Sequence, residues 1–146
     1  MDPVLALSIT GGVVLLAAAL GVLWKTTQGR SRGGNGASFQ PGELPELDEF
    51  GSGATLVQFS TEFCSTCPAT RRFLKHVASE RDGVAYHDVD LTHRPDLAKR
   101  LHILQTPTVF VLDPKGRLAS RFGGAPRRDE LGTVLDTLVP APEWNL

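Results

Sequence analysis

The chain has 146 residues, with 15 Lys and Arg against 16 Asp and Glu and a formal net charge of −1. This length suits about one folded domain, and the near-neutral balance lacks the basic excess of a protein that binds nucleic acid, so no nucleic-acid partner is expected. Hydrophobic residues make up 41% and charged residues 21%, which is ordinary globular usage and argues against a wholly disordered chain.

The first predicted element is an apolar helix over residues 4–24, which carry no charge. At 1.5 Å per residue it would span about 31 Å, enough for a hydrocarbon core of about 30 Å. The rest of the chain is too short to surround such a helix on all sides. A cleavable signal peptide would have positive residues before the apolar run, whereas Met1, Asp2 and Pro3 precede it. We therefore expect an uncleaved, single-pass transmembrane helix.

The charges that flank this helix predict its orientation. Lys25, Arg30 and Arg32 follow the helix, and no Lys or Arg precedes it. Because cytoplasmic flanks of membrane helices carry the excess of Lys and Arg, the rule predicts that the following domain faces the cytoplasm. The extracytoplasmic side stays open as the alternative, since disulfides persist there.

Residues 25–50 are expected to form a flexible linker. Their first half is polar and rich in glycine, so it buries too little apolar area to offset its ordering entropy. In the second half, Leu44, Leu47 and Phe50 recur at a spacing of three, which suggests one or two helical turns packed on the domain.

The folded domain is expected over residues 51–140, followed by a C-terminal tail at 141–146. Its hydrophobic patterns follow the order β-α-β-α-β-β-α, which indicates an α/β fold. The expected strands are 54–60, 84–89, 108–112 and 117–122, and the expected helices are 64–79, 95–100 and 128–139.

Both cysteines of the chain lie in one C-x-x-C motif, Cys64-Ser65-Thr66-Cys67, where a strand gives way to a helix. The partial positive charge of a helix N-terminus stabilises a thiolate, so Cys64 should ionise readily. Cys67 lies one turn further on and can reach Cys64. The pair could therefore attack a substrate disulfide, form a mixed disulfide and resolve it internally.

The two cysteines could also form a structural disulfide or part of a zinc site. A structural disulfide would close too short a loop to stabilise the fold much. A zinc site would need two of the four histidines, and their spacing matches no zinc finger or ribbon, so no metal site is predicted.

The domain resembles the thioredoxin family over residues 47–139. The residues that carry the resemblance are Leu56-Val57-Gln58-Phe59, Cys64 to Cys67, Tyr86 to Asp90, Thr106-Pro107-Thr108, Gly116 and Gly123-Gly124. The resemblance implies a central mixed β-sheet flanked by helices. It also implies that a redox-active disulfide between Cys64 and Cys67 serves in place of any separate cofactor.

The resemblance implies roles for several residues. Cys64 would attack and Cys67 would resolve. The bond before Pro107 would be cis, and the Thr106 backbone would pair with a substrate peptide. Phe63 stands where the family usually has Trp, and Ser65 and Thr66 separate the two cysteines.

Further features depart from the family pattern. Gln58 holds the position of the usual buried acid, and Tyr86 that of its usual Lys neighbour, so these two become the candidates for proton handling. The family's first strand has no clear counterpart.

The sequence thus predicts a membrane-anchored thiol–disulfide oxidoreductase. Its partners would be protein thiols and disulfides, an upstream reductase or thiol donor, and the membrane through residues 4–24. The alternatives are a redox-inactive binding or scaffold module of the same fold, and a metallochaperone that holds a soft metal ion on the two cysteines.

Overall fold

Side chains that alternate along the strands of a central sheet pack into a hydrophobic core on each of its two faces. The computed structural model describes residues 2–27, 31–34 and 36–139. The strands are β1 (Ser31–Gly33), β2 (Ala54–Ser60), β3 (Val84–Asp90), β4 (Thr108–Leu112) and β5 (Leu118–Gly123). Their order is β1-β5-β4-β2-β3, and β2 pairs parallel with β3 and antiparallel with β4. The expected mixed sheet is therefore confirmed.

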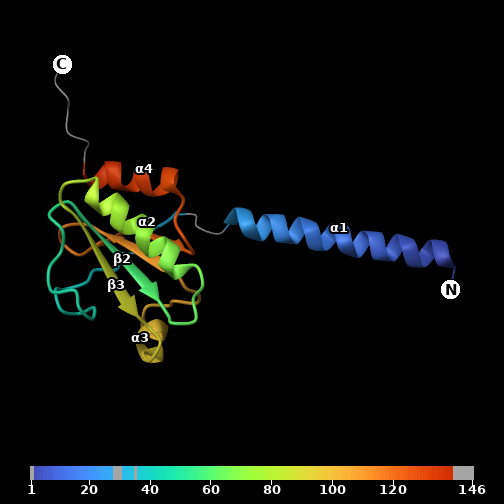
Figure 1. Ribbon diagram of the computed structural model, residues 1–146, viewed down its shortest axis with the longest axis horizontal. Coiled ribbons are helices and arrows are strands. Elements are labelled where there is room, and N and C mark those ends of the chain that lie inside the picture. Colours follow the sequence, from blue (N-terminus) through green and yellow to red (C-terminus); the bar gives the residue numbers. More distant parts are fainter. Residues whose placement is uncertain (1, 28–30, 35, 140–146) are drawn as a thin grey trace, which may run out of the picture.

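Helices cover both faces of this sheet (Figure 1). They are α2 (Cys67–Ser79), α3 (Pro95–Arg100) and α4 (Arg128–Leu138). One core joins α2 and α4 to the sheet and includes Leu56, Leu74, Val109 and Leu131. The other core joins α3 to the opposite face and includes Phe59, Leu97 and Phe110. Because β2 contributes to both cores, all seven of its residues are buried.

The predicted elements are confirmed in kind and order, with shifted ends. The α2 helix begins at Cys67 instead of residue 64, because the residues before Pro68 form a turn and proline favours the first helical positions. No strand pairs with the outer side of β3 in the described part of the chain. The predicted tail, residues 141–146, lies outside the described residues.

The N-terminal helix, α1 (Pro3–Thr27), is long and apolar enough to cross a membrane, and it is exposed along its described length. In Figure 1 it projects away from the sheet and its helices.

The expected linker differs from a free tether over much of its length. The Ser31–Gly33 strand pairs with β5, and Ser38 bridges to Arg117. Phe39, Leu44 and Leu47 are buried in the core on the α3 face, so the packed unit begins well before residue 51. These apolar side chains cover a sheet face that α3 alone is too short to cover.

The predicted packing of Leu44 and Leu47 is correct, but the helical turns are not. Gly42 has φ of 79° and Glu46 has φ of 63°, and both values lie in the left-handed region that a right-handed helix excludes. Turns take the helix's place, closed by hydrogen bonds from the Gly42 N–H to the Leu47 carbonyl and from the Leu47 N–H to the Leu44 carbonyl.

Asp113 organises the turn between β4 and β5. Its carboxylate accepts hydrogen bonds from the Lys115 and Arg117 N–H groups, at 2.8 and 2.9 Å, and from Arg117 Nε at 2.7 Å. The same turn holds Gly116, whose carbonyl accepts from the Phe39 N–H and whose φ of 76° favours glycine. Burial alone would raise the pKa of the Asp113 carboxyl, but these hydrogen bonds outweigh burial and hold it below its ordinary value.

We therefore expect Asp113→Ala to lower the free energy of unfolding by about 1–3 kcal/mol, because it leaves two N–H groups and a guanidinium without their acceptor. The folded-state pKa is depressed, so this contribution is present at neutral pH and is lost as the pH falls below about 4. Urea denaturation of both chains at pH 7 and pH 3 would measure it. An equal difference at both pH values would show that the carboxylate charge is not what stabilises the turn.

Candidate functional site

The two cysteines are joined by a disulfide in the turn between β2 and α2. Cys67 is the first residue of α2 and is only 2% exposed, whereas Cys64 lies in the preceding turn and is half-buried. The Cys67 N–H donates to the Cys64 carbonyl at 3.3 Å, which fixes the turn. An approaching molecule therefore meets the Cys64 sulfur first.

The residues between the cysteines are exposed at the start of α2. Thr66 is the N-cap residue, but its side chain makes no capping hydrogen bond. Its hydroxyl instead lies 3.8 Å from the Cys64 sulfur. A thiolate formed at Cys64 would thus have both a hydroxyl donor and the N-terminus of a helix beside it.

The loop before β4 lies against this turn. The Thr106–Pro107 peptide bond is cis, and Pro107 is buried. The Thr106 hydroxyl lies 3.3 Å from the Thr61 hydroxyl, while the Thr61 carbonyl accepts from the Cys64 N–H at 3.2 Å. Sequence reasoning missed Thr61, whose hydroxyl contact links the two loops.

Two apolar side chains stand out around these loops. Phe63 is 86% exposed and Leu104 is 95% exposed, and outside α1 they are the only large exposed hydrophobic residues in the described part of the chain. Phe63 directly precedes Cys64, and Leu104 comes two residues before Thr106. Sequence reasoning selected Phe63 and missed Leu104, because hydrophobic periodicity does not reveal an apolar side chain that faces solvent from a turn.

Gln58 ties the sheet to the first residue of α2. Its side chain is fully buried, and its amide nitrogen donates to the Cys67 carbonyl at 3.1 Å. The Tyr86 hydroxyl donates to the Gln58 side-chain oxygen at 3.0 Å. The structure therefore brings Gln58 to the backbone carbonyl of Cys67, whereas Tyr86 contacts Gln58.

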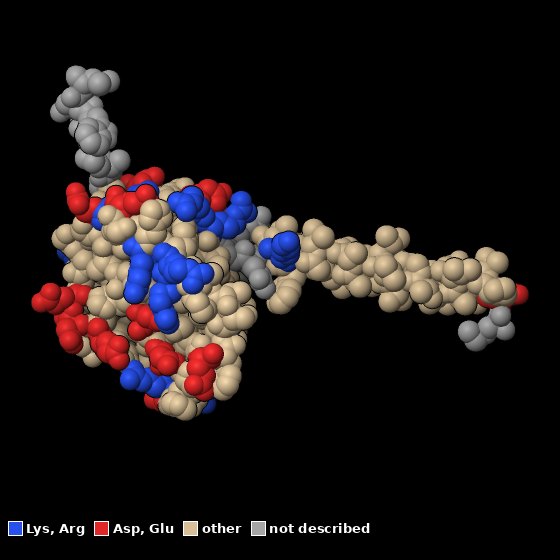
Figure 2. Space-filling model, viewed as in Figure 1, with Lys and Arg blue, Asp and Glu red and all other residues tan. Residues whose placement is uncertain are grey.

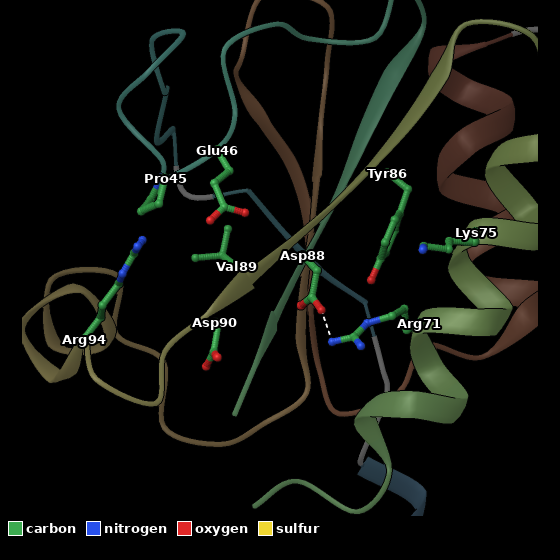
Figure 3. A pocket seen from close by; sticks show the side chains of 9 residues that line it. All are labelled: Pro45, Glu46, Arg71, Lys75, Tyr86, Asp88, Val89, Asp90 and Arg94. Carbon is green, nitrogen blue, oxygen red and sulfur yellow. Dashed lines mark hydrogen bonds and ion pairs between the residues drawn. The ribbon is translucent and has the colours of Figure 1, made fainter. Parts of the chain in front are cut away.

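Tyr86 connects these buried hydrogen bonds to charged residues at the edge of the sheet. Burial, and secondarily the charge of Asp88, raise the pKa of the Tyr86 phenol to about 12, although Arg71 acts in the opposite direction. The phenol thus keeps its proton at neutral pH and stays a donor to Gln58. Figure 3 shows Tyr86 pointing between β3 and α2, near Lys75, whose ammonium lies 5.8 Å from the centre of the ring.

No third His, Asp or Glu joins the two cysteines in a metal-binding cluster within the part of the chain that the structure describes. A cleft of about 380 Å³ lies elsewhere, along the outer edge of β3. Tyr86 alone among the predicted site residues lines it. The disulfide lies outside this cleft, and only its half-buried Cys64 side reaches the surface.

Known proteins share both sequence and fold with this chain. Thioredoxin H2 of Arabidopsis thaliana is 32% identical over 76 residues, which are 52% of this chain and 56% of the relative, so the chain spans about half of that protein's length. Spinach chloroplast thioredoxin f superposes with a TM-score of 0.52 at 24% identity, over 60% of this chain and 78% of that one. A mutant thioredoxin from Halobacterium salinarum superposes with a TM-score of 0.53 at 17% identity, over 62% and 78% of the two chains.

The family assignment depends on the sequence match. The sequence model of the thioredoxin family matches residues 46–137, which are more than half of the chain. These residues hold the disulfide, the cis-proline loop and the strands β2 to β5. The chain belongs to the thioredoxin family.

Proposed function

We propose that the protein is a membrane-anchored thiol–disulfide oxidoreductase that acts on protein substrates. The observation that carries this proposal is the unequal burial of the Cys64–Cys67 pair at the start of α2. Membership of the thioredoxin family supports thiol–disulfide chemistry in general, and the exposed Cys64 side supports a large substrate.

The proposed reduction runs in two exchanges from the dithiol form. The Cys64 thiolate attacks one sulfur of a substrate disulfide, forms a mixed disulfide and releases the other substrate sulfur as a thiolate that takes up a proton. Cys67 then loses its proton and attacks the Cys64 sulfur, which re-forms the Cys64–Cys67 disulfide and frees the second substrate thiol. The substrate gains the two electrons that the pair loses, so an upstream reductase or thiol donor must restore the dithiol.

The surroundings of Cys64 suit the attacking role. The N-terminus of α2 and the Thr66 hydroxyl would stabilise its thiolate, whereas the burial of Cys67 would keep that thiol protonated until the mixed disulfide forms. Phe63 and Leu104 would contact apolar side chains beside the substrate disulfide, and the Thr106 backbone next to Pro107 would pair with the substrate main chain.

This mechanism predicts different outcomes for the two single-cysteine variants. Cys67→Ser should accumulate a mixed disulfide with an insulin chain, because Cys64 still attacks and nothing resolves the product. Cys64→Ser should trap none, and both variants should lose turnover in insulin reduction by dithiothreitol. Non-reducing electrophoresis and mass spectrometry would identify the adduct.

The same assay separates the alternatives. A scaffold module would bind partners equally well with either serine variant and would not accelerate insulin reduction. A metallochaperone would retain a metal ion on the anaerobically purified dithiol at a stoichiometry near one, and elemental analysis would detect it. Equal alkylation rates of Cys64 and Cys67 near pH 7 would contradict the assignment of Cys64 as the nucleophile.

We further propose that proton transfer at Cys67 uses no buried carboxylate. Gln58 does not titrate, and the raised pKa of Tyr86 keeps the phenol neutral below about pH 10, so neither group should add an ionisation to the wild-type profile. The proton would leave through water or a hydroxyl. The hydrogen bond from Gln58 to the Cys67 carbonyl would hold Cys67 in place during this transfer.

Gln58→Asp should therefore add an ionisation to the pH profile of insulin reduction between pH 5 and 9. Burial would raise the pKa of the new carboxyl into this range, and the rate should change several-fold as it titrates. Tyr86→Phe is the matched control, because it removes the hydrogen bond to Gln58 without introducing a titrating group. A Gln58→Asp profile that matches the wild-type profile would contradict the placement of this residue on the proton path.

We propose that α1 anchors the domain in the membrane and that the domain faces the cytoplasm. The length and apolar surface of α1 support the anchor. Lys25 in the last turn of α1 and Arg30 and Arg32 after it, against Asp2 before it, favour the inward side. On that side the reducing glutathione pool would favour the dithiol form and hence a reductase; on the outer side an oxidising role would follow.

Labelling of Cys64 in intact cells tests this topology. After gentle reduction, a membrane-impermeant maleimide should label Cys64 only once the cells are lysed. Cys64→Ser supplies the background, because Cys67 is buried. Full labelling without lysis would place the domain outside the cell and would remove the main support for the reductase direction.

A further inference from the structure

The outer edge of β3 is unpaired in the described part of the chain. Only β2 neighbours β3, in a regular seven-residue register without a bulge. The Gly83 carbonyl accepts from the Ala54 N–H and the Leu91 N–H donates to the Ser60 carbonyl, so odd-numbered residues direct their main-chain groups toward β2. The main-chain groups of Val84, Tyr86, Asp88 and Asp90 therefore point away from the sheet.

Most of these outward groups have no protein partner among the described residues. The Val84 N–H donates to the Arg81 carbonyl, but no main-chain hydrogen bond reaches the outward groups of Tyr86 or Asp88. Edge strands are usually protected by charged side chains, above all lysine, by proline or by a bulge, and of these β3 has only the carboxylates of Asp88 and Asp90. The edge is thus a template on which another strand could pair.

Charged side chains of both signs line the cleft along this edge. Figure 3 shows β3 passing between Arg71 and Lys75 of α2 on one side and Glu46 and Arg94 on the other. The lining holds three basic and three acidic residues, counting Asp88 and Asp90, and Arg71 pairs with Asp88. Figure 2 shows this mixture on the surface, with basic side chains over α2 and acidic ones beside them.

This balance favours one kind of occupant. A ligand of a single charge sign would meet as many like as opposite charges. A second copy of the same surface carries the same mixture and can match it under a two-fold axis. Two copies of β3 could also pair without a change in the backbone conformation of either strand.

We propose that β3 pairs antiparallel with β3 of a second copy of this chain, so that the two sheets become one. Full overlap of residues 84–90 places His87 on the two-fold axis and sets Asp88 opposite the second copy's Tyr86. Lys75, above Tyr86, then faces the second copy's Asp88. Moving the axis to Asp88 would set two carboxylates opposite each other, which is unfavourable, so the charges select the His87-centred register.

The test uses the full chain in detergent solution, with both active-site cysteines replaced by serine so that the result does not depend on thiol exchange at the proposed site. In this background, His87→Cys places one thiol on the axis. Directly opposed residues of a non-hydrogen-bonded antiparallel pair have Cα atoms about 4.5 Å apart, which a disulfide can span. Lys99→Cys, exposed at the end of α3, is the matched control.

We expect His87→Cys to form a cross-linked dimer at least about tenfold faster than Lys99→Cys under mild oxidation, because pairing raises the effective thiol concentration far above that of free chains. Adding Asp88→Pro should abolish the difference, since it removes an outward N–H without removing a bond to β2. Adding Asp88→Ala should reduce the difference far less than Asp88→Pro does, because Ala also loses the charge that faces Lys75 and Arg71 but retains the N–H.

Circular dichroism checks that each variant folds. If Asp88→Pro does not fold, the comparison of His87→Cys with Lys99→Cys still tests the proposal. Equal cross-linking of His87→Cys and Lys99→Cys would overturn the proposal, as would a folded Asp88→Pro chain that cross-links as fast as Asp88→Ala. A chain that is monomeric by light scattering at tens of micromolar would overturn it too.

Discussion

The hydrogen bond from the buried Gln58 amide to the Cys67 carbonyl holds the redox pair in register with the sheet. Gln58 lies in β2, the strand that contributes to both hydrophobic cores, so the start of α2 is fixed to a fully buried strand. Tyr86 completes the arrangement from β3 by donating to the other end of the same amide. Because a neutral amide makes both bonds, no buried charge has to be compensated beside the disulfide.

That attachment leaves the two sulfurs in different surroundings. Cys67 shares the buried environment of β2, whereas Cys64 belongs to a turn whose neighbours Phe63 and Thr66 face solvent. The Thr61 hydroxyl joins this turn to the cis-proline loop through its contact with the Thr106 hydroxyl. Phe63 and Leu104 bury almost no apolar area within the described chain, so both side chains are free to contact another macromolecule.

Sequence patterns predicted the strands β2 to β5, the helices and the cysteine pair because each leaves a local signal: alternation, helical periodicity, or a C-x-x-C motif before a helix. The strand β1 lies in the segment that was predicted to be a flexible linker. The conformation of residues 37–50 was out of reach, because Leu44 and Leu47 show a helix-like spacing whereas the positive φ values of Gly42 and Glu46 depend on packing against α3 and the sheet. The exposure of Leu104 is also a tertiary property. Resemblance to a family placed Gln58 near the site, but only the three-dimensional structure shows that its amide donates a hydrogen bond to the Cys67 carbonyl.

The same segment explains how the domain closes its core although α3 is short. Residues 37–47 run from the turn between β4 and β5, where the Phe39 N–H bonds to Gly116, across the face that carries Phe59 and Phe110. This path covers the α3 face of the sheet but adds no strand beside β3. The hydrophobic requirement of the fold is thereby met while one row of main-chain groups stays unpaired. Burial of apolar faces and pairing of strand edges are separate constraints, and in this chain only the first is satisfied within the described residues.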